Sequence, residues 1–297
     1  MKVMNINRVW GVLLGCVLGG FVLVVPVSAQ GTEAEYRATL ITLITVLQEQ
    51  VALLQAQVAP AQLPNTSGLL GDIEGTLVAS YTVSDGAIST RAPRAYRDYL
   101  ERLLTILPDQ YDDHVDELVV FADGDQNIGA YVETVIPYTQ DWRYAIRDTE
   151  IAEDPDSAAS TELMIHEFAH IFSLDQVFRG QVSSAGCHPY FADTLCYGSD
   201  TYLGQFIATF WSTRMLDQLQ AIKTGSRLTP AGFYDRYESQ FVSEYASTDP
   251  AEDFAESFAW YVYGEIAPRG SVADEKIAFF DQFAYIRALA DAIREEI

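Results

Sequence analysis

The chain has 297 residues, of which 49% are hydrophobic and 20% are charged, and an apolar fraction this high excludes a disordered chain. The length allows one large domain or two small ones, with enough chain for a sizeable core. A formal net charge of -24 argues against nucleic acids and anionic membrane surfaces as partners, because both would repel the chain.

The N-terminal segment 1–29 has the organisation of an export signal. Two basic residues precede an apolar run over 9–25, and a Val-Ser-Ala pattern ends at Ala29. This organisation predicts a secretory signal peptide that is cleaved after Ala29. The segment is also long enough to remain as a membrane anchor, whereas the lipoprotein-like pattern at Cys16 fits poorly because the apolar run continues beyond it. Each interpretation predicts a secreted protein or one held at the extracellular cell surface.

Residues 30–58 are predicted to form a short amphipathic helix. Its apolar positions alternate in steps of four and three, at Leu40, Ile44, Leu47, Val51, Leu54 and Val58. This heptad pattern is typical of parallel two-stranded coiled coils, which favours a homodimer through residues 36–58. A single helix that is only marginally stable alone fits the pattern equally well. Residues 59–71, rich in Pro, Gly and small polar residues, predict a linker.

Residues 72–297 are predicted to form one α+β domain, with a small mixed sheet followed by packed helices. Strands are expected at 118–121, 129–136 and 142–147. Helices are expected at 93–107, 156–174, 200–222, 232–243, 250–263 and 273–295. The segment Asp-Gly-Asp-Gln-Asn at 123–127 resembles the start of a calcium-binding loop, but Ile128 stands where that loop requires Gly. A hairpin turn is therefore the preferred interpretation.

The segment His166-Glu167-Phe168-Ala169-His170 lies in one of these predicted helices. Residues four apart share a helix face, so the two imidazoles can bind one zinc ion while Glu167 reaches the metal-bound water. Zinc makes that water acidic, the carboxylate takes its proton, and the hydroxide attacks a carbonyl that the metal polarises. The alternative is a helix with two ordinary histidines, which is weakened because the motif uses two of only four His in the chain.

Cysteine usage points to an oxidising compartment. Removal of the signal peptide leaves only Cys187 and Cys196, nine positions apart in a loop rich in Gly, Pro and Ser. An even pair in an exported chain predicts one local disulfide. A metal pair with the adjacent His188 is the alternative, but the spacing is longer than in typical zinc clips.

A catalytic zinc site needs a third protein ligand. The helix expected over 250–263 offers two carboxylates on one face, Glu252 and Glu256, four positions apart. Glu252 also falls at the third helical position after the potential cap Asp249, where a capping Glu is common in any protein. Two acids on one face of a buried helix favour one metal ligand and one hydrogen-bond acceptor for a ligand imidazole. Periodicity alone does not choose between them.

The two polar segments together resemble the gluzincin metallopeptidases. Within that family, they are most similar to the group that contains the catalytic domain of the anthrax toxin lethal factor and related exported bacterial enzymes. The resemblance covers residues 155–263 and is carried by the motifs His-Glu-Phe-Ala-His and Tyr-x-x-Thr-Asp-x-x-Glu-Asp-Phe-Ala-Glu-x-Phe. It implies a zincin-like fold with one zinc ion per chain. The implied roles are zinc ligands for His166, His170 and Glu252, a base for Glu167, an oxyanion-stabilising hydroxyl for Tyr245, and an acceptor that orients a ligand histidine for Glu256.

The sequence and the resemblance together predict an exported zinc-dependent endopeptidase. Its peptide or protein substrate is expected to lie extended along an edge strand such as 129–136, as in strand addition. The alternative is a non-catalytic surface or interaction protein with a structural or vestigial zinc site. Glu167 argues against that alternative, because a purely structural site has no use for a base. A zinc hydrolase that acts on other bonds fits the same spacing.

Overall fold

The computed structural model of the chain describes residues 17–18, 21–22, 75–122, 128–135, 140–175, 187, 190–192, 195–264 and 269–297. The chain divides into two compact units, Met1–Asn65 and Thr66–Ile297. In the first unit, the described residues form two short antiparallel strands, β1 (Val17–Leu18) and β2 (Phe21–Val22). The rest of the predicted signal peptide, the predicted helix 30–58, the linker 59–71 and the loop 123–127 lie outside the described residues. None of the described helices has the length and apolarity needed to cross a bilayer.

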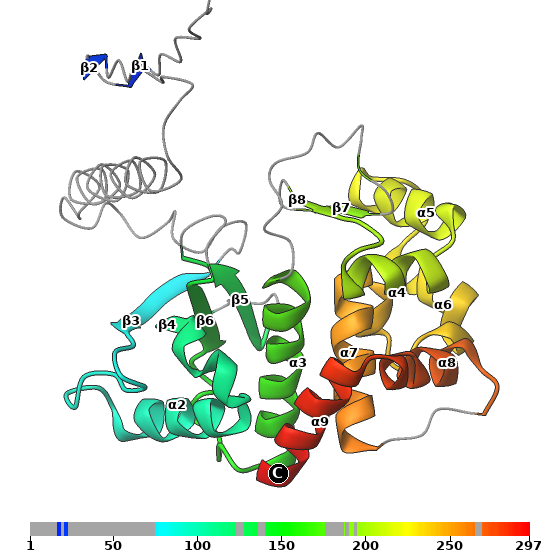
Figure 1. The fold of residues 1–297 in the computed structure, drawn as a ribbon. Coiled ribbons are helices and arrows are strands. Elements are labelled where there is room, and N and C mark those ends of the chain that lie inside the picture. Colours follow the sequence, from blue (N-terminus) through cyan, green and yellow to red (C-terminus); the bar gives the residue numbers. More distant parts are fainter. Residues whose placement is uncertain are drawn as a thin grey trace, which may run out of the picture. The chain divides into compact units, whose positions relative to one another are not determined.

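The second unit contains a four-stranded sheet with the strand order β3-β4-β6-β5 (Figure 1). Its strands are β3 (Thr76–Thr82), β4 (Val115–Ala122), β5 (Ala130–Thr134) and β6 (Trp142–Arg147). Strands β4 and β6 are parallel, and the other neighbours are antiparallel, so the sheet is mixed. The three predicted strands correspond to β4, β5 and β6. Among the described strands, β3 and β5 form the two edges.

Strand β3 was not predicted from the sequence. Its residues alternate between exposed and half-buried positions, and none of its side chains is buried. The apolar alternation that marks a half-buried strand is therefore weak in β3. Strand β4 carries a fully buried run from Leu118 to Phe121, which made it easy to recognise.

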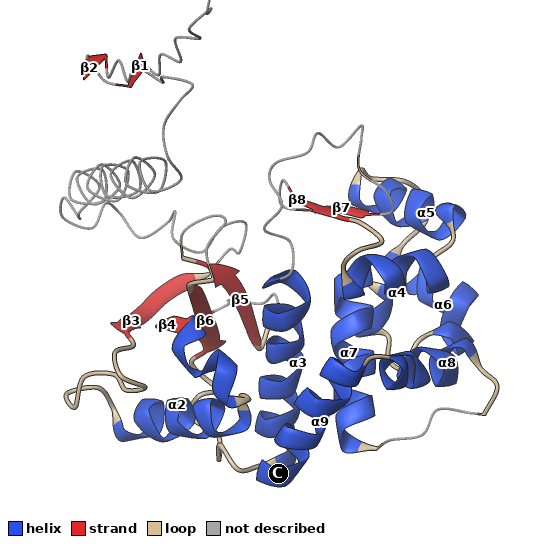
Figure 2. Ribbon diagram, viewed as in Figure 1, coloured by secondary structure: helices blue, strands red, loops and turns tan. Residues whose placement is uncertain are grey.

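Among the described residues of the second unit, helices contain more residues than strands (Figure 2). They are α2 (Arg94–Ile106), α3 (Ala158–Asp175), α4 (Tyr202–Phe210), α5 (Thr213–Lys223), α6 (Pro230–Tyr237), α7 (Pro250–Tyr263), α8 (Val272–Phe279) and α9 (Ala284–Glu296). Short 3-10 helices are η2 (Asp109–His114), η4 (Glu238–Gln240), η5 (Tyr245–Ser247) and η6 (Phe280–Gln282). A small hairpin joins β7 (Tyr190–Ala192) to β8 (Leu195–Tyr197). This mixture of a small sheet and several helices agrees with the predicted α+β class.

Two helices that were predicted as continuous, over 200–222 and 273–295, are broken in the structure, and a third, over 232–243, becomes α6 and η4 and ends at an extended Phe241. The prediction over 200–222 becomes α4 and α5, because Trp211 adopts an extended backbone and buries its ring, with its indole N–H donating to Asp253. The prediction over 273–295 becomes α8, η6 and α9, with an extended backbone at Phe283. Apolar periodicity runs across both breaks, so the pattern could not reveal them.

Helix α3 lies between the sheet and α7, and Figure 1 shows it standing beside β5. Its apolar side chains are fully buried on several faces: Met164, Ile165, Phe168, Ala169, Ile171 and Phe172. One continuous core joins these side chains to the inner face of the sheet and to α2, α4 and α7. A helix that is apolar on nearly all sides is a buried helix. The polar residues of α3 are therefore placed inside the domain, where they need partners.

Candidate metal centre

His166 and His170 lie one turn apart on α3, and both imidazoles face Glu252 on α7. The Nε2 atom of His166 lies 3.0 Å from Oε2 of Glu252, and Nε2 of His170 lies 3.2 Å from the same oxygen. The two Nε2 atoms are 3.2 Å apart. Three potential metal-binding atoms from two helices, far apart in the sequence, therefore surround a single point.

The spacing of these three atoms fits one zinc ion. Ligand atoms held about 2.0–2.1 Å from a tetrahedral zinc ion lie about 3.3 Å from one another. The Nδ1 atom of His166 lies 2.8 Å from Oε1 of Glu256, so a neutral His166 donates its one proton there and turns the lone pair of Nε2 toward Glu252. Two lone pairs 3.0 Å apart repel unless a cation lies between them. The donor set therefore calls for a proton or a metal ion at its centre.

The pKa of His166 is raised, which means that the site favours a positive charge at this imidazole. Burial alone lowers the pKa of His166, but hydrogen bonds with Glu252 and Glu256 outweigh it and raise the pKa to about 10. Burial alone would raise the pKa of Glu252, but His170 and the hydrogen bonds with both imidazoles lower it. Without metal, His166 therefore carries a proton on the atom that would bind zinc. A metal ion that binds at this position would have to displace that proton.

Packing between α3 and α7 fixes the distance between the histidines and Glu252. Phe258 on α7 packs against Phe172 and Phe168 on α3, with ring centroids 4.9 Å and 6.4 Å away. Phe254 packs against Phe172 at 5.6 Å. Aromatic side chains bury large areas, so these contacts contribute strongly to holding the two helices together. Packing between the apolar faces of α3 and α7 thus fixes the positions of the polar side chains on the same two helices.

Glu256 lies one turn after Glu252 and contacts the other ring nitrogen of His166. Its second oxygen, Oε2, accepts a hydrogen bond from the hydroxyl of Ser243 at 2.7 Å. Burial would raise the pKa of Glu256, but the hydrogen bonds from His166 and Ser243 lower it, so the carboxylate stays charged. The two acids, which periodicity could not tell apart, thus make different contacts: Glu252 lies against both Nε2 atoms, and Glu256 lies against Nδ1 of His166.

Ser243 is the functional candidate that sequence reasoning missed. Besides donating to Glu256, its oxygen accepts a hydrogen bond from the backbone N–H of Ala246 at 3.0 Å. It therefore connects the segment that carries Tyr245 to the acceptor behind His166. No motif marks a lone serine in a loop. The one available signal is that Ser243 lies two residues before Tyr245.

Glu167 is buried next to the three potential ligands, with 3% of its surface exposed. Within the described residues, its Oε2 atom has no hydrogen-bond partner. Burial raises the pKa of Glu167, and the charges of Glu252 and Glu256 add to this, whereas the two histidines act in the opposite direction. A buried carboxylate with a free oxygen and a raised pKa is well suited to accept a proton.

Tyr245 lies on the open side of the site, in η5. Its ring centroid is 5.8 Å from that of His166, and 52% of the residue is exposed. Loss of solvent around the phenol raises the pKa of Tyr245, and the charges of Glu252 and Glu167 raise it further. The hydroxyl therefore stays protonated at neutral pH and can donate a hydrogen bond. A half-exposed tyrosine beside the potential ligands can reach a molecule that enters from solvent.

The predicted local disulfide is present, because Cys187 and Cys196 are joined sulfur to sulfur across the β7–β8 hairpin. Neither cysteine is then available as a metal ligand. His188, the third member of the alternative metal pair, lies outside the described residues. The cysteine pair therefore contributes to the shape of the domain and does not form a second metal centre.

Comparison with known proteins supports a zinc peptidase. Residues 187–266 match the model of a family described as "putative zinc-binding metallo-peptidase". The matched stretch includes Tyr245, Glu252 and Glu256 but begins after the histidines on α3, and it covers less than half of the chain. Comparisons with curated proteins and with solved structures give no significant match.

Proposed function

We propose that this protein is an exported zinc-dependent endopeptidase of the gluzincin type, with a zincin-like fold and one zinc ion per chain. The observation that carries the proposal is the meeting of His166, His170 and Glu252 beside the buried carboxylate of Glu167. The family match supports both the metal and the class of reaction. The disulfide supports export, since such bonds persist in oxidising compartments.

The three converging residues would hold the metal through both Nε2 atoms and Oε2 of Glu252. When bound there, zinc supplies a Lewis acid that polarises a peptide carbonyl and makes water acidic. Glu256 keeps the proton of His166 on Nδ1, which leaves Nε2 free to bind, and Ser243 holds Glu256 in place. These contacts fix the ring orientation before any substrate arrives.

Glu167 and Tyr245 would act on the substrate. The carboxylate of Glu167 accepts the proton of the attacking water and then delivers it to the nitrogen of the leaving amine. The hydroxyl of Tyr245 donates a hydrogen bond to the carbonyl oxygen as negative charge develops on it. Tyr245 is 52% exposed and Glu167 is 3% exposed, so the tyrosine is the more accessible of the two groups to a substrate that enters from solvent.

Strand β5 offers a place for the substrate backbone. It pairs only with β6 among the described strands and packs beside α3, which carries the two histidines. An extended peptide can add to such an edge through backbone hydrogen bonds, which suits hydrolysis of many sequences within a chain. The substrate class is therefore a peptide or an unfolded protein segment.

Peptide-library profiling of purified residues 30–297 tests this proposal. The zinc-loaded protein should cleave internal peptide bonds, and a chelator should abolish cleavage until zinc is restored. Absence of cleavage across the library by a protein that does bind zinc would favour the non-catalytic alternative. A protein that never binds zinc would contradict the proposal altogether.

A further inference from the structure

The disulfide hairpin reaches the helix that carries Glu252 through one side chain. Tyr190 lies on β7, and its hydroxyl donates a hydrogen bond to Oδ1 of Asp249 at 2.6 Å. Asp249 is the N-cap of α7, where the same oxygen accepts a hydrogen bond from the backbone N–H of Ala251 at 3.0 Å. A phenol from a distant hairpin thus shares the carboxylate oxygen that begins α7.

Asp249 is a junction of three elements. Its other oxygen, Oδ2, lies 2.7 Å from the ammonium group of Lys223, the last residue of α5. The Lys223 side chain is 52% exposed, whereas that of Asp249 is 19% exposed. An exposed ion pair contributes little, because solvent screens it and the long side chain loses entropy. The hydrogen bond from Tyr190 is therefore the contact that best fixes the orientation of this carboxylate.

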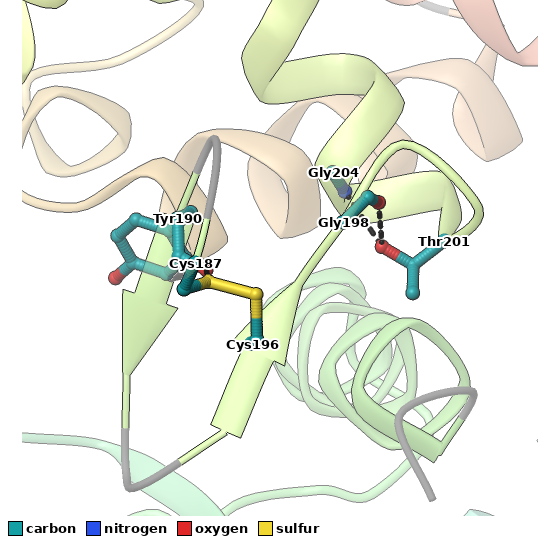
Figure 3. The surroundings of a disulfide bond; sticks show 6 residues. All are labelled: Cys187, Tyr190, Cys196, Gly198, Thr201 and Gly204. Atoms are coloured by element: carbon teal, nitrogen blue, oxygen red, sulfur yellow. Dashed lines mark hydrogen bonds between the residues drawn. A yellow bond between two sulfur atoms is a disulfide. The ribbon is translucent and has the colours of Figure 1, made fainter. Parts of the chain in front are cut away.

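The hairpin is fixed where the chain enters it and where the chain leaves it (Figure 3). The disulfide joins Cys187, which precedes β7, to Cys196 on β8. Where the chain leaves β8, the carbonyl of Gly198 accepts a hydrogen bond from the Thr201 hydroxyl at 2.9 Å. These contacts restrict the position of the Tyr190 backbone.

The exit of the hairpin also packs tightly on α4. The Thr201 oxygen accepts a hydrogen bond from the N–H of Gly204 at 2.9 Å, which caps this helix. A Cβ atom added at Gly204 would lie 1.9 Å from the carbonyl oxygen of Gly198, so only glycine permits this approach. These contacts fix the hairpin against the helical core. Because Tyr190 is part of the hairpin, they also restrict where Tyr190 lies.

We propose that Tyr190 is a positioning residue for Glu252, and that the Cys187–Cys196 disulfide acts on the metal centre through it. This inference rests on the proposed function. Glu252 lies in the first turn of α7, three residues after Asp249. The first turn of a helix has unpaired N–H groups and frays most easily, so the cap decides whether it is formed. In this proposal, Tyr190 fixes the orientation of Asp249. Asp249 in turn stabilises the first turn of α7, which places Glu252 next to both histidines.

Zinc affinity of Tyr190→Phe tests the inference, because this change removes only the hydroxyl. Competition with a chromogenic chelator measures zinc affinity of the full chain, and thermal unfolding of the metal-free form measures stability. Direct partners of a ligand typically contribute 10- to 100-fold in metal affinity. Tyr190 acts one step further away, so we expect a loss of roughly three- to tenfold.

Tyr261→Phe is the matched control. Tyr261 also donates to an aspartate, Oδ1 of Asp281, at 2.8 Å, but from the opposite end of α7. This variant should lose stability of the metal-free form without losing zinc affinity. Equal zinc affinity in Tyr190→Phe and wild type would overturn the inference, and so would an equal loss in both tyrosine variants. Failure of the wild type itself to bind zinc would instead contradict the proposed function.

The disulfide is tested by Cys187→Ser combined with Cys196→Ser. If the disulfide acts through Tyr190, adding Tyr190→Phe to this pair should cause little further loss, because the two changes interrupt one path. Fully additive losses would show that the disulfide and Tyr190 act independently. If the cysteine variant does not fold, Tyr190→Phe alone still decides the role of the hydroxyl.

Discussion

Oε1 of Glu256 lies 2.8 Å from Nδ1 of His166, on the side of the imidazole opposite Glu252. The imidazole is thus held between two carboxylates, one at each ring nitrogen. One carboxylate sets which nitrogen carries the proton, and the other shares the remaining nitrogen with the proposed metal position.

This arrangement assigns different consequences to the loss of each acid. Glu252→Ala should purify with little zinc and no activity, because a direct ligand is lost. Glu256→Ala should keep zinc, with affinity or activity reduced about 10- to 100-fold. Zinc content and zinc affinity of the two purified variants check this. If Glu256→Ala were the metal-free variant, the two roles would be exchanged.

Ser243→Ala should weaken zinc binding less than Glu256→Ala, by a factor below about 10, because it loosens Glu256 without removing it. Chelator competition gives the affinity. Ser271→Ala is a suitable control: Ser271 accepts a hydrogen bond from the N–H of Asp274 at the start of α8. The control should cost about 1 kcal/mol of stability and no zinc affinity. Identical zinc affinities for Ser243→Ala and the wild type would remove Ser243 from the site.

Zinc binding at pH 7 should release about one proton, because His166 must lose the proton that its raised pKa retains. Apparent zinc affinity should therefore rise with pH, up to a pH of about 10. The folding stability of the metal-free protein should instead fall as the pH rises. A pKa raised on folding stabilises the folded state fully below the unfolded value, and this stability is lost as pH rises toward 10. Calorimetry in buffers of different ionisation enthalpy measures the protons released; a value near zero would contradict the assignment.

Tyr245→Phe should keep zinc and stability but lose about 100-fold or more in turnover, since one donor to the developing oxyanion is removed. The exposure of Tyr245 explains why little stability should be lost. Steady-state kinetics and thermal unfolding, measured on the same preparation, check both parts. Near-normal turnover would mean that Tyr245 only lines the site.

The residues of the candidate site are easier to predict from the sequence than the ends of the helices and strands are. His166, Glu167 and His170 were recognisable because helical spacing is local, and Glu252 and Glu256 because they repeat that spacing on an apolar helix. What brings the two helices together is the packing of Phe172 against Phe254 and Phe258. Side-chain patterns mark each face as buried but do not say which faces meet.

The remaining features depend on contacts between distant residues. The break after α4 depends on Trp211 reaching Asp253, and the role suggested for Ser243 depends on Glu256. Tyr190 reaches Asp249 from a hairpin too short to leave a clear strand pattern. In each case the local sequence is ordinary, and only the folded chain shows the partner.

In the proposed function, Glu167 activates water at a zinc ion held by His166, His170 and Glu252. The most direct measurement compares peptide cleavage by the wild type and by Glu167→Gln at equal zinc content. Glutamine keeps the shape of the side chain but cannot accept the proton, so zinc should stay near one ion per chain while turnover falls by about 100-fold or more. Wild-type turnover by a fully zinc-loaded Glu167→Gln would show that Glu167 is not the base.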